Sequence, residues 1–270
     1  MSYVAENTGY PVVYWNRVPG CNKYRIYRST SKDGTYKSIG LVDTGSSMYG
    51  QYGWGDDTAK AGTKYYYKVR AYSYTDVVSS YSSAVALRCD LAQPQVSVTG
   101  NASTGKPVVK WKTVSGAAKY YIYRATSKTG EYKKIATAVS ARSYEDSSTK
   151  AGKTYYYKVK AIHENTDANS AYSAVVSRMC DLKRPSVTVS LSSGGDPVLK
   201  WKEISGAEKY VVYRATSKSG TYKKIATTTS EKYVDKNVSA GKTYYYKVKA
   251  LHAKSGANSA YSAIDSIRAK

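Results

Sequence analysis

The chain has 270 residues, with 42 Lys and Arg against 19 Asp and Glu, a formal net charge of +23, and 31 Tyr but no Phe. The positive charge favours anionic partners, although lysines on the solvent face of every strand would produce the same excess. The sequence has no run of 18 apolar residues and no block of five like charges. This excludes a membrane-spanning helix and makes a basic nucleic-acid-binding arm unexpected.

A first repeat unit is predicted over residues 1–91, and most of its leading strand is missing. Only fourteen residues precede Trp15, whereas Val96 and Val98 stand 111 − 96 = 15 and 111 − 98 = 13 residues before the equivalent Trp111. We therefore expect the chain to be a piece of a longer protein, in which any signal peptide or anchor lies elsewhere.

The middle loop of this unit, residues 42–57, is predicted to carry a binding site. Between matching Ile and Gly positions it is six residues longer than its counterpart in the second unit, 62 − 39 = 23 against 152 − 135 = 17. Tyr49 and Tyr52 are extra aromatic residues on it, and loops on rigid scaffolds often carry function. An extension of the edge strand is the alternative. Trp54 takes the place of Tyr144 in the second unit and is predicted to lie in the core.

Two further units are predicted over residues 92–182 and 183–270. The segment "AGKTYYYKVKA" occurs at 151–161 and at 240–250, and "AGTKYYYKVRA" occurs at 61–71. The glycines of this motif lie 152 − 62 = 90 and 241 − 152 = 89 residues apart, which is typical of a tandem array. A unit of about ninety residues can close its own core without metals or disulfides.

Each unit repeats the same order of short β-type segments. In "PVVKWK", Val109 and Trp111 face one side and the residues between them face the other, the period of a half-buried strand. Gly34, Gly130 and Gly220 are expected to supply positive φ in a hairpin turn. Seven such segments, separated by turn residues, predict an all-β chain of three tandem seven-stranded antiparallel β-sandwiches. A small closed barrel is the alternative.

The triple tyrosine of the repeated motif follows from strand alternation. Tyr155 and Tyr157 would face inward, and Tyr156 and Lys158 would face outward. A buried tyrosine hydroxyl without a partner costs about 1–3 kcal/mol. We therefore expect thin cores in which the inward hydroxyls reach water or a backbone carbonyl.

The unit resembles the fibronectin type III pattern, at Trp111, Tyr120-x-Ile122, Tyr144-x-Asp146 and Gly152-x-x-Tyr155-x-Tyr157-x-Val159-x-Ala161. In particular it is similar to the Lys- and Tyr-rich repeats of Gram-positive bacterial surface proteins. The resemblance implies a fibronectin type III or immunoglobulin-like sandwich. It also implies that Tyr65, Tyr155 and Tyr244 form a structural tyrosine corner, whose hydroxyl bonds back to the chain upstream.

The outward residues of two neighbouring strands would share an exposed face in every unit. An aromatic and cationic face of this kind could stack on sugar rings or meet an acidic protein surface, whereas ordinary cross-strand packing is the alternative. The candidate binding surface comprises Tyr27, Tyr66, Tyr121, Tyr123, Tyr156, Lys158, Tyr213 and Tyr245, together with Tyr49 and Tyr52. Flanking positions on these faces are Arg25, Lys68, Arg70, Lys160, Val211, Lys247 and Lys249.

Motifs for catalysis or nucleotide binding are not found in the sequence. His163 and His252 have no triad partners, Asp56, Asp146 and Asp235 recur at one turn where they would bind backbone N–H groups, and three cysteines give no disulfide framework. We therefore expect no enzyme, no cofactor and no bound metal.

The sequence favours a semi-rigid, monomeric, extracellular spacer and adhesion module of a bacterial surface protein. Its linkers "CDLAQP" and "CDLKRP" carry proline and no glycine, so three units would form a rod on the order of 100 Å long. Expected partners are a host or neighbouring surface protein or a cell-surface glycan, and sequence-specific nucleic acid is not expected. A carbohydrate-binding module and a ligand for a host receptor or immunoglobulin are the alternatives.

Overall fold

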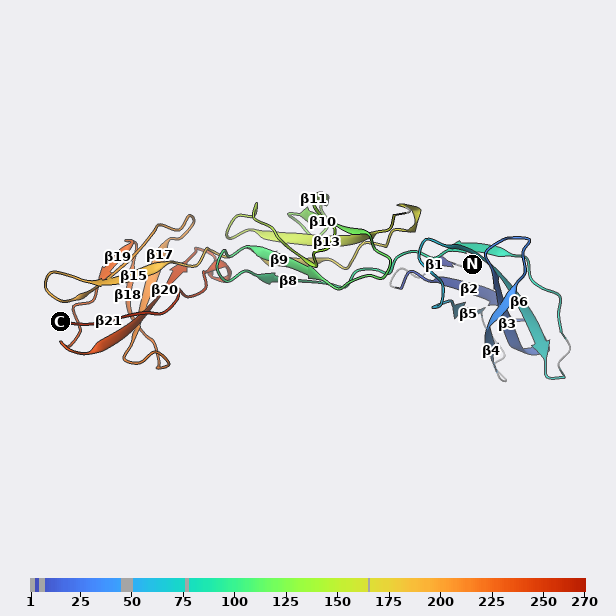
Figure 1. Cartoon of the computed structure of the whole chain (residues 1–270), viewed down its shortest axis with the longest axis horizontal. Coiled ribbons are helices and arrows are strands. Elements are labelled where there is room, and N and C mark those ends of the chain that lie inside the picture. The colour runs from blue at the N-terminus through green and yellow to red at the C-terminus, as the bar shows by residue number, and fades with distance from the viewer. Residues whose placement is uncertain (1–2, 5–7, 45–50, 76–77, 165) are drawn as a thin grey trace.

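The computed structural model describes residues 3–4, 8–44, 51–75, 78–164 and 166–270. Over these ranges the chain is almost entirely β-structure, in six antiparallel sheets of three or four strands. Figure 1 shows the sheets gathered in pairs, which follow one another end to end along the long axis of the molecule. The prediction of an all-β chain of tandem antiparallel sandwiches is confirmed.

The second sandwich has the order β8-β9-β12 in one sheet and β11-β10-β13-β14 in the other. The chain therefore crosses between the two sheets three times, after β9, β11 and β12, and the strands form two separate sheets rather than a closed barrel. The strands are β8 (Val96–Gly100), β9 (Pro107–Trp111), β10 (Lys119–Ala125), β11 (Lys133–Ala138), β12 (Ser143–Glu145), β13 (Thr154–Ile162) and β14 (Val176–Met179).

The third sandwich repeats this topology, as β15-β16-β19 and β18-β17-β20-β21. Its strands are β15 (Val187–Leu191), β16 (Pro197–Trp201), β17 (Lys209–Ala215), β18 (Lys223–Thr228), β19 (Lys232–Val234), β20 (Thr243–Leu251) and β21 (Asp265–Arg268). Short 3-10 turns, η1 (Thr166–Ala168) and η2 (Ser255–Ala257), follow β13 and β20.

The first sandwich pairs β1-β2-β5 with β4-β3-β6-β7. Its strands are β1 (Tyr3–Val4), β2 (Pro11–Asn16), β3 (Cys21–Ser29), β4 (Lys37–Asp43), β5 (Gln51–Gly55), β6 (Lys64–Ser73) and β7 (Val85–Arg88). β5 has five residues where β12 has three, so the described part of the long middle loop extends an edge strand. Trp54 pairs with Val13 as Tyr144 pairs with Val109, and it packs against the first core.

Alternation in the Tyr-rich strands builds the cores. Along β13, buried and half-buried residues alternate. The inward residues Tyr157 and Val159 are fully buried and pack with Val109 and Trp111 of the facing sheet. β-Branched and aromatic side chains suit this pleated, half-buried setting. Each sandwich has such a core of its own.

The hairpin turns at Gly34, Gly130 and Gly220 correct one expectation. None of these glycines has positive φ. Instead, a Cβ on Gly130 would lie 2.5 Å from the Ser127 hydroxyl oxygen, and Gly34 and Gly220 are similarly crowded by a serine. Close approach of a serine side chain, rather than positive φ, is therefore the feature that these three turns share.

Candidate functional site

The four-stranded sheet of the second sandwich carries a compact group of outward rings and amines. The Tyr123 and Tyr172 rings meet edge to face with centroids 5.1 Å apart. Lys158 Nζ lies 4.3 Å from the Tyr132 ring centroid, and Lys160 Nζ lies 5.2 Å from that of Tyr172. Because each amine lies over a ring, the face is held together by its own cation–π contacts.

The same group recurs in the other two sandwiches. Tyr27 meets Tyr81 and Tyr213 meets Tyr261 with nearly the same edge-to-face geometry. Lys247 Nζ lies 4.1 Å from the Tyr261 centroid. The sequence did not predict that Tyr81, Tyr172 and Tyr261 would join these groups. A signal was available, because a Tyr flanked by small residues recurs as "SSYSS", "SAYSA" and "SAYSA" before the last strand.

Two of the outward tyrosines, Tyr27 and Tyr123, have a pKa well above neutral pH. Burial, together with a hydrogen bond to Tyr172, raises the pKa of Tyr123 to about 12. Burial and a hydrogen bond to Tyr72 likewise raise the pKa of Tyr27 to about 12. The positive charge of these faces therefore comes from Lys and Arg alone and is not balanced by tyrosinate.

The remaining outward candidates are half-buried rather than open. Lys134 Nζ lies 4.3 Å from the Tyr121 ring, and Lys64 Nζ lies 5.5 Å from the Tyr66 ring. Tyr156 and Tyr245 are also half-buried. Val211 corrects an expectation, since it was assigned to an exposed face and is only 4% exposed. Tyr210, Val211 and Val212 are buried in succession along β17, so burial does not alternate there as it does in β13.

The two loop candidates of the first unit have different outcomes. Tyr49 lies outside the described residues. Tyr52 was expected to be an exposed extra ring, but it is half-buried, with centroids 5.3 Å from Tyr24 and 6.4 Å from Trp15. Its place opposite Trp15 in the β2–β5 register turns the ring onto the core.

Tyr65, Tyr155 and Tyr244 each bond back to the chain five residues upstream. The hydroxyl of Tyr155 accepts a hydrogen bond from the Lys150 N–H at 3.0 Å. Tyr65 and Tyr244 accept equivalent bonds from Lys60 and Ser239. These rings therefore fasten the loop that precedes the motif strand, and they are buried.

The second inward tyrosine of each motif has a partner that the sequence reasoning did not foresee. Tyr157 is fully buried, and its hydroxyl donates to Oδ2 of the fully buried Asp146 at 3.0 Å rather than to water or a carbonyl. Arg124 donates to the same carboxylate at 2.8 Å, and Ser148 donates through its hydroxyl at 2.7 Å. The expected backbone bond is also present, from the Ser148 N–H.

This buried cluster is repeated in all three sandwiches. Tyr67 and Arg28 donate to Asp56, and Tyr246 and Arg214 donate to Asp235, at 2.6–2.9 Å. The predicted turn aspartates are therefore core anchors as well as turn residues. A signal was available, because the Asp and the Tyr lie 11 residues apart in every unit.

The Asp146 cluster predicts a stability change in acid. Burial alone would raise the pKa of this carboxyl, but hydrogen bonds from Ser148 and Arg124 and the Arg124 charge hold the pKa below its ordinary value. The stabilisation is therefore complete above the ordinary pKa of about 3.9 and is lost as pH falls through the lower folded-state value. We expect the urea midpoint of the second sandwich to fall over that range, and to fall less in Asp146→Asn. Equal acid sensitivity of the two proteins would contradict this assignment.

A leucine fastens each sandwich to the next. Leu91 is 1% exposed and lies in the second core, and its N–H donates to the Ala168 carbonyl in η1 at 2.9 Å. Leu182 lies likewise in the third core, and its N–H donates to the Ala257 carbonyl in η2 at 2.8 Å. Both links therefore bury apolar surface of one unit inside its neighbour.

A histidine packs on a glycine at the same two junctions. A Cβ added to Gly62 would lie 2.6 Å from Cε1 of His163, and one added to Gly152 would lie 2.4 Å from Cε1 of His252. His252 is held in place because its Nδ1 accepts the Lys254 N–H at 2.9 Å. The histidines of the repeat are thus junction residues.

The described residues also bear on metal binding, membrane crossing and the state of the cysteines. They contain no group of three or more His, Cys, Asp or Glu side chains able to hold a metal ion. Within the same ranges, no helix has the length and apolar character needed to cross a membrane. All three cysteines are free, and burial raises the pKa of the Cys89 thiol to about 11.

Comparison with known proteins finds relatives among modules of larger enzymes. No family model matches the chain. It is 28% identical over 254 residues to exoglucanase B of Cellulomonas fimi, covering 84% of this chain and 21% of that enzyme. It is 36% identical over 77 residues to an amylopullulanase of Thermoanaerobacterium saccharolyticum, covering 28% of this chain and 6% of that enzyme. The chain thus spans about a fifth or less of these relatives.

Among solved structures, an Fn3-like protein from Clostridium thermocellum is 36% identical in sequence. The match covers 31% of this chain and 88% of that chain, with a TM-score of 0.29. The fold itself rests on strand order: a three-stranded sheet of the first, second and fifth strands faces a four-stranded sheet of the remaining strands in each unit. The chain is therefore a tandem array of β-sandwiches of the fibronectin type III and immunoglobulin-like class.

Proposed function

We propose that the chain is a non-enzymatic, semi-rigid spacer and interaction segment of an extracellular bacterial surface protein or surface-acting enzyme. It would act as a monomer that holds neighbouring parts at a fixed distance and meets a host or neighbouring surface protein or a glycan. The division into units 1–91, 92–182 and 183–270 is part of this proposal. The relatives support a non-catalytic module, because the matched part is a small fraction of each enzyme.

The single observation that carries the proposal is the repeated junction. A flexible linker would leave its backbone groups to water, whereas Leu91 and Leu182 are buried in the next core and their N–H groups bond to it. Burying a leucine side chain contributes about 1.5–3 kcal/mol. Two junctions of the same kind therefore favour one preferred orientation over free rotation of the units.

Small-angle scattering tests this directly. We expect the chain to have a maximum dimension on the order of 100 Å, unchanged between low and moderate salt, because the buried leucines contribute more than the exposed Arg88–Asp167 ion pair that crosses the first junction. A distribution of distances typical of a compact particle, or one that broadens with salt, would contradict the spacer function.

A second candidate function, carbohydrate binding, is favoured by one observation. Tyr172 and Tyr261 are 43% and 40% exposed at the edge of each Tyr–Lys group, so that a sugar ring could stack on them. We expect Tyr172→Ala to weaken any glycan binding that a glycan array detects. The control Val139→Ala truncates an exposed apolar side chain outside these groups and should leave such binding unchanged. If the chain binds no glycan on the array, this candidate function is excluded. Binding to a host receptor or an immunoglobulin would then be tested with the same variants.

A further inference from the structure

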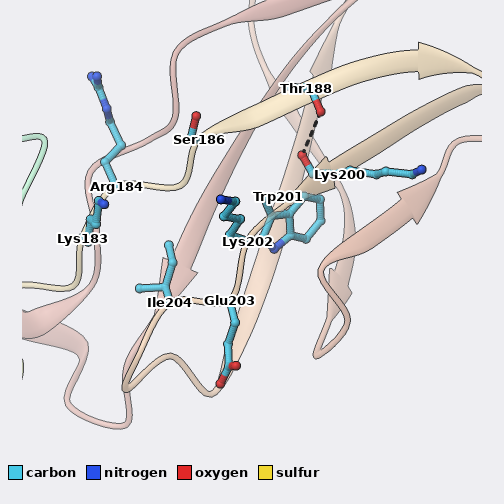
Figure 2. A pocket seen from close by; sticks show the side chains of 9 residues that line it. All are labelled: Lys183, Arg184, Ser186, Thr188, Lys200, Trp201, Lys202, Glu203 and Ile204. Carbon is cyan, nitrogen blue, oxygen red and sulfur yellow. Dashed lines mark hydrogen bonds between the residues drawn. The ribbon is translucent and has the colours of Figure 1, made fainter.

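The second junction carries a strongly basic groove beside the linker of the third sandwich. One pocket of about 360 Å³ is lined by nine residues, among them Lys183, Arg184, Lys200 and Lys202. Figure 2 shows Lys202 next to Trp201, Lys183 and Arg184 on the linker at the left of the view, and Lys200 extending toward the opposite side. Among the described residues, none of the four cations has an ion-pair partner.

This pocket continues across the junction into a second one. The second pocket, of about 700 Å³, shares Lys183, Glu203 and Ile204 with the first and adds Lys106 and Lys150 from the second sandwich. It also includes Asp181, but Arg178 pairs with that carboxylate at 2.6 Å. Glu203 is therefore the carboxylate left to oppose six basic side chains over the described lining of both pockets.

The first junction provides a comparison within the same chain. Asp90 and Asp181 hold equivalent places, because their N–H groups donate to the carbonyls of Gly9 and Gly105. Two and three residues later the first junction has Ala92 and Gln93 where the second has Lys183 and Arg184.

The charge of the two junction pockets differs accordingly. The corresponding pocket of the first junction, about 430 Å³, is lined by Asp57 and Asp90 and by one lysine, Lys60. The backbone of the junction is thus repeated, whereas an excess of basic over acidic side chains is found only in the pockets of the second junction.

The lining indicates the chemistry of an occupant. Ser186, Thr188 and Ser205 add hydroxyl groups to the cations, a combination that suits a ligand with both acidic and hydroxyl groups. Trp201 is 6% exposed and Ile204 is 8% exposed, so neither the indole ring nor the Ile204 side chain is open to a peptide side chain. An exposed aromatic platform for a nucleic-acid base is likewise missing from the described lining.

We propose that this groove, from Lys150 across Lys183 and Arg184 to Lys202, binds an acidic polysaccharide through its carboxylate or sulfate groups. Unpaired cations close together interact more strongly with a multiply charged chain than with a single ion. The site is separate from the Tyr–Lys faces and does not depend on them, so its failure would leave the spacer function intact.

The test is titration of the whole chain with oligogalacturonate, with a heparin oligosaccharide and with neutral dextran. We expect binding to one or both acidic probes and none to dextran. The double variant Lys183→Ala, Arg184→Gln gives the second junction the residues of the first, and it should bind at least about tenfold more weakly. The two acidic probes distinguish carboxylate from sulfate as the recognised group.

A matched control removes the same charge from the other sheet. Lys223 and Lys224 are exposed on β18 of the same sandwich, and Lys223→Ala, Lys224→Gln should change the affinity less than about twofold. Equal losses of affinity in both double variants would show that binding depends on the overall positive charge rather than on the groove, and would overturn the site. No binding of either acidic probe, or equally tight binding of polyglutamate or single-stranded DNA, would also overturn it.

Discussion

Asp146→Ala is expected to lower the free energy of unfolding of the second sandwich by about 3–5 kcal/mol, because removing one member of a buried charged cluster leaves the others unpaired. Asp146 is fully buried, and it accepts hydrogen bonds from Arg124, Tyr157 and Ser148. Without it, the Tyr157 hydroxyl is left inside the core and the guanidinium of Arg124 loses its counter-charge.

Hydrogen exchange measured by mass spectrometry can assign this loss to one sandwich of the intact chain. Exchange in β9 and β13 should rise by about two to four orders of magnitude, and exchange in β16 and β20 should change little. Tyr157→Phe is the graded control, since it removes one hydrogen bond and should cost about 1–2 kcal/mol. A loss below about 1 kcal/mol for Asp146→Ala would show that the cluster contributes little.

Gly152→Ala is expected to disrupt the second junction, which is the second large effect. The added Cβ would lie 2.4 Å from Cε1 and 2.6 Å from Nε2 of His252, closer than such atoms can approach. His252 cannot simply swing aside without losing the hydrogen bond from the Lys254 N–H. We expect the ring to shift off Gly152 and to lose this contact, so the third sandwich should sample more orientations. The distribution of fluorescence energy transfer efficiencies between dyes at the two ends of the chain should therefore broaden.

Gly241 offers a control within the same chain. It stands at the equivalent turn of the third sandwich with φ 75°, close to the 73° of Gly152, but no histidine ring packs on it. Gly241→Ala therefore imposes the same backbone strain, about 1 kcal/mol, without the clash. If both variants changed the end-to-end distribution equally, strain rather than the His252 contact would be responsible.

Strand positions could be predicted from the sequence because they depend on local alternation. Val109 and Trp111 were expected on one face of a strand, and both are buried in the second core. The exposed fraction of a side chain was less predictable than the face of the strand on which it lies. Tyr52 and Val211 differ from expectation because exposure depends on which side chains of neighbouring strands cover a position, and strand alternation does not include them.

The candidate surfaces show the same limit at the level of contacts. The outward placement of Tyr123 and Lys158 followed from alternation, but Tyr172 joins them from a segment 172 − 123 = 49 residues away. Likewise, the recurring Asp146 was predicted to bind nearby backbone, and its partners Arg124 and Tyr157 come from two strands of the facing sheet.

The sequence by itself determined the repeat, the strands and the inward and outward faces of this protein, since each depends on residue spacing along the chain. The tertiary structure decided which side chains meet: the buried Asp–Arg–Tyr clusters, the leucine and histidine junctions, and the basic groove at one junction but not the other. These contacts join residues brought together only when sheets pack and sandwiches dock, and their geometry is not contained in any local pattern.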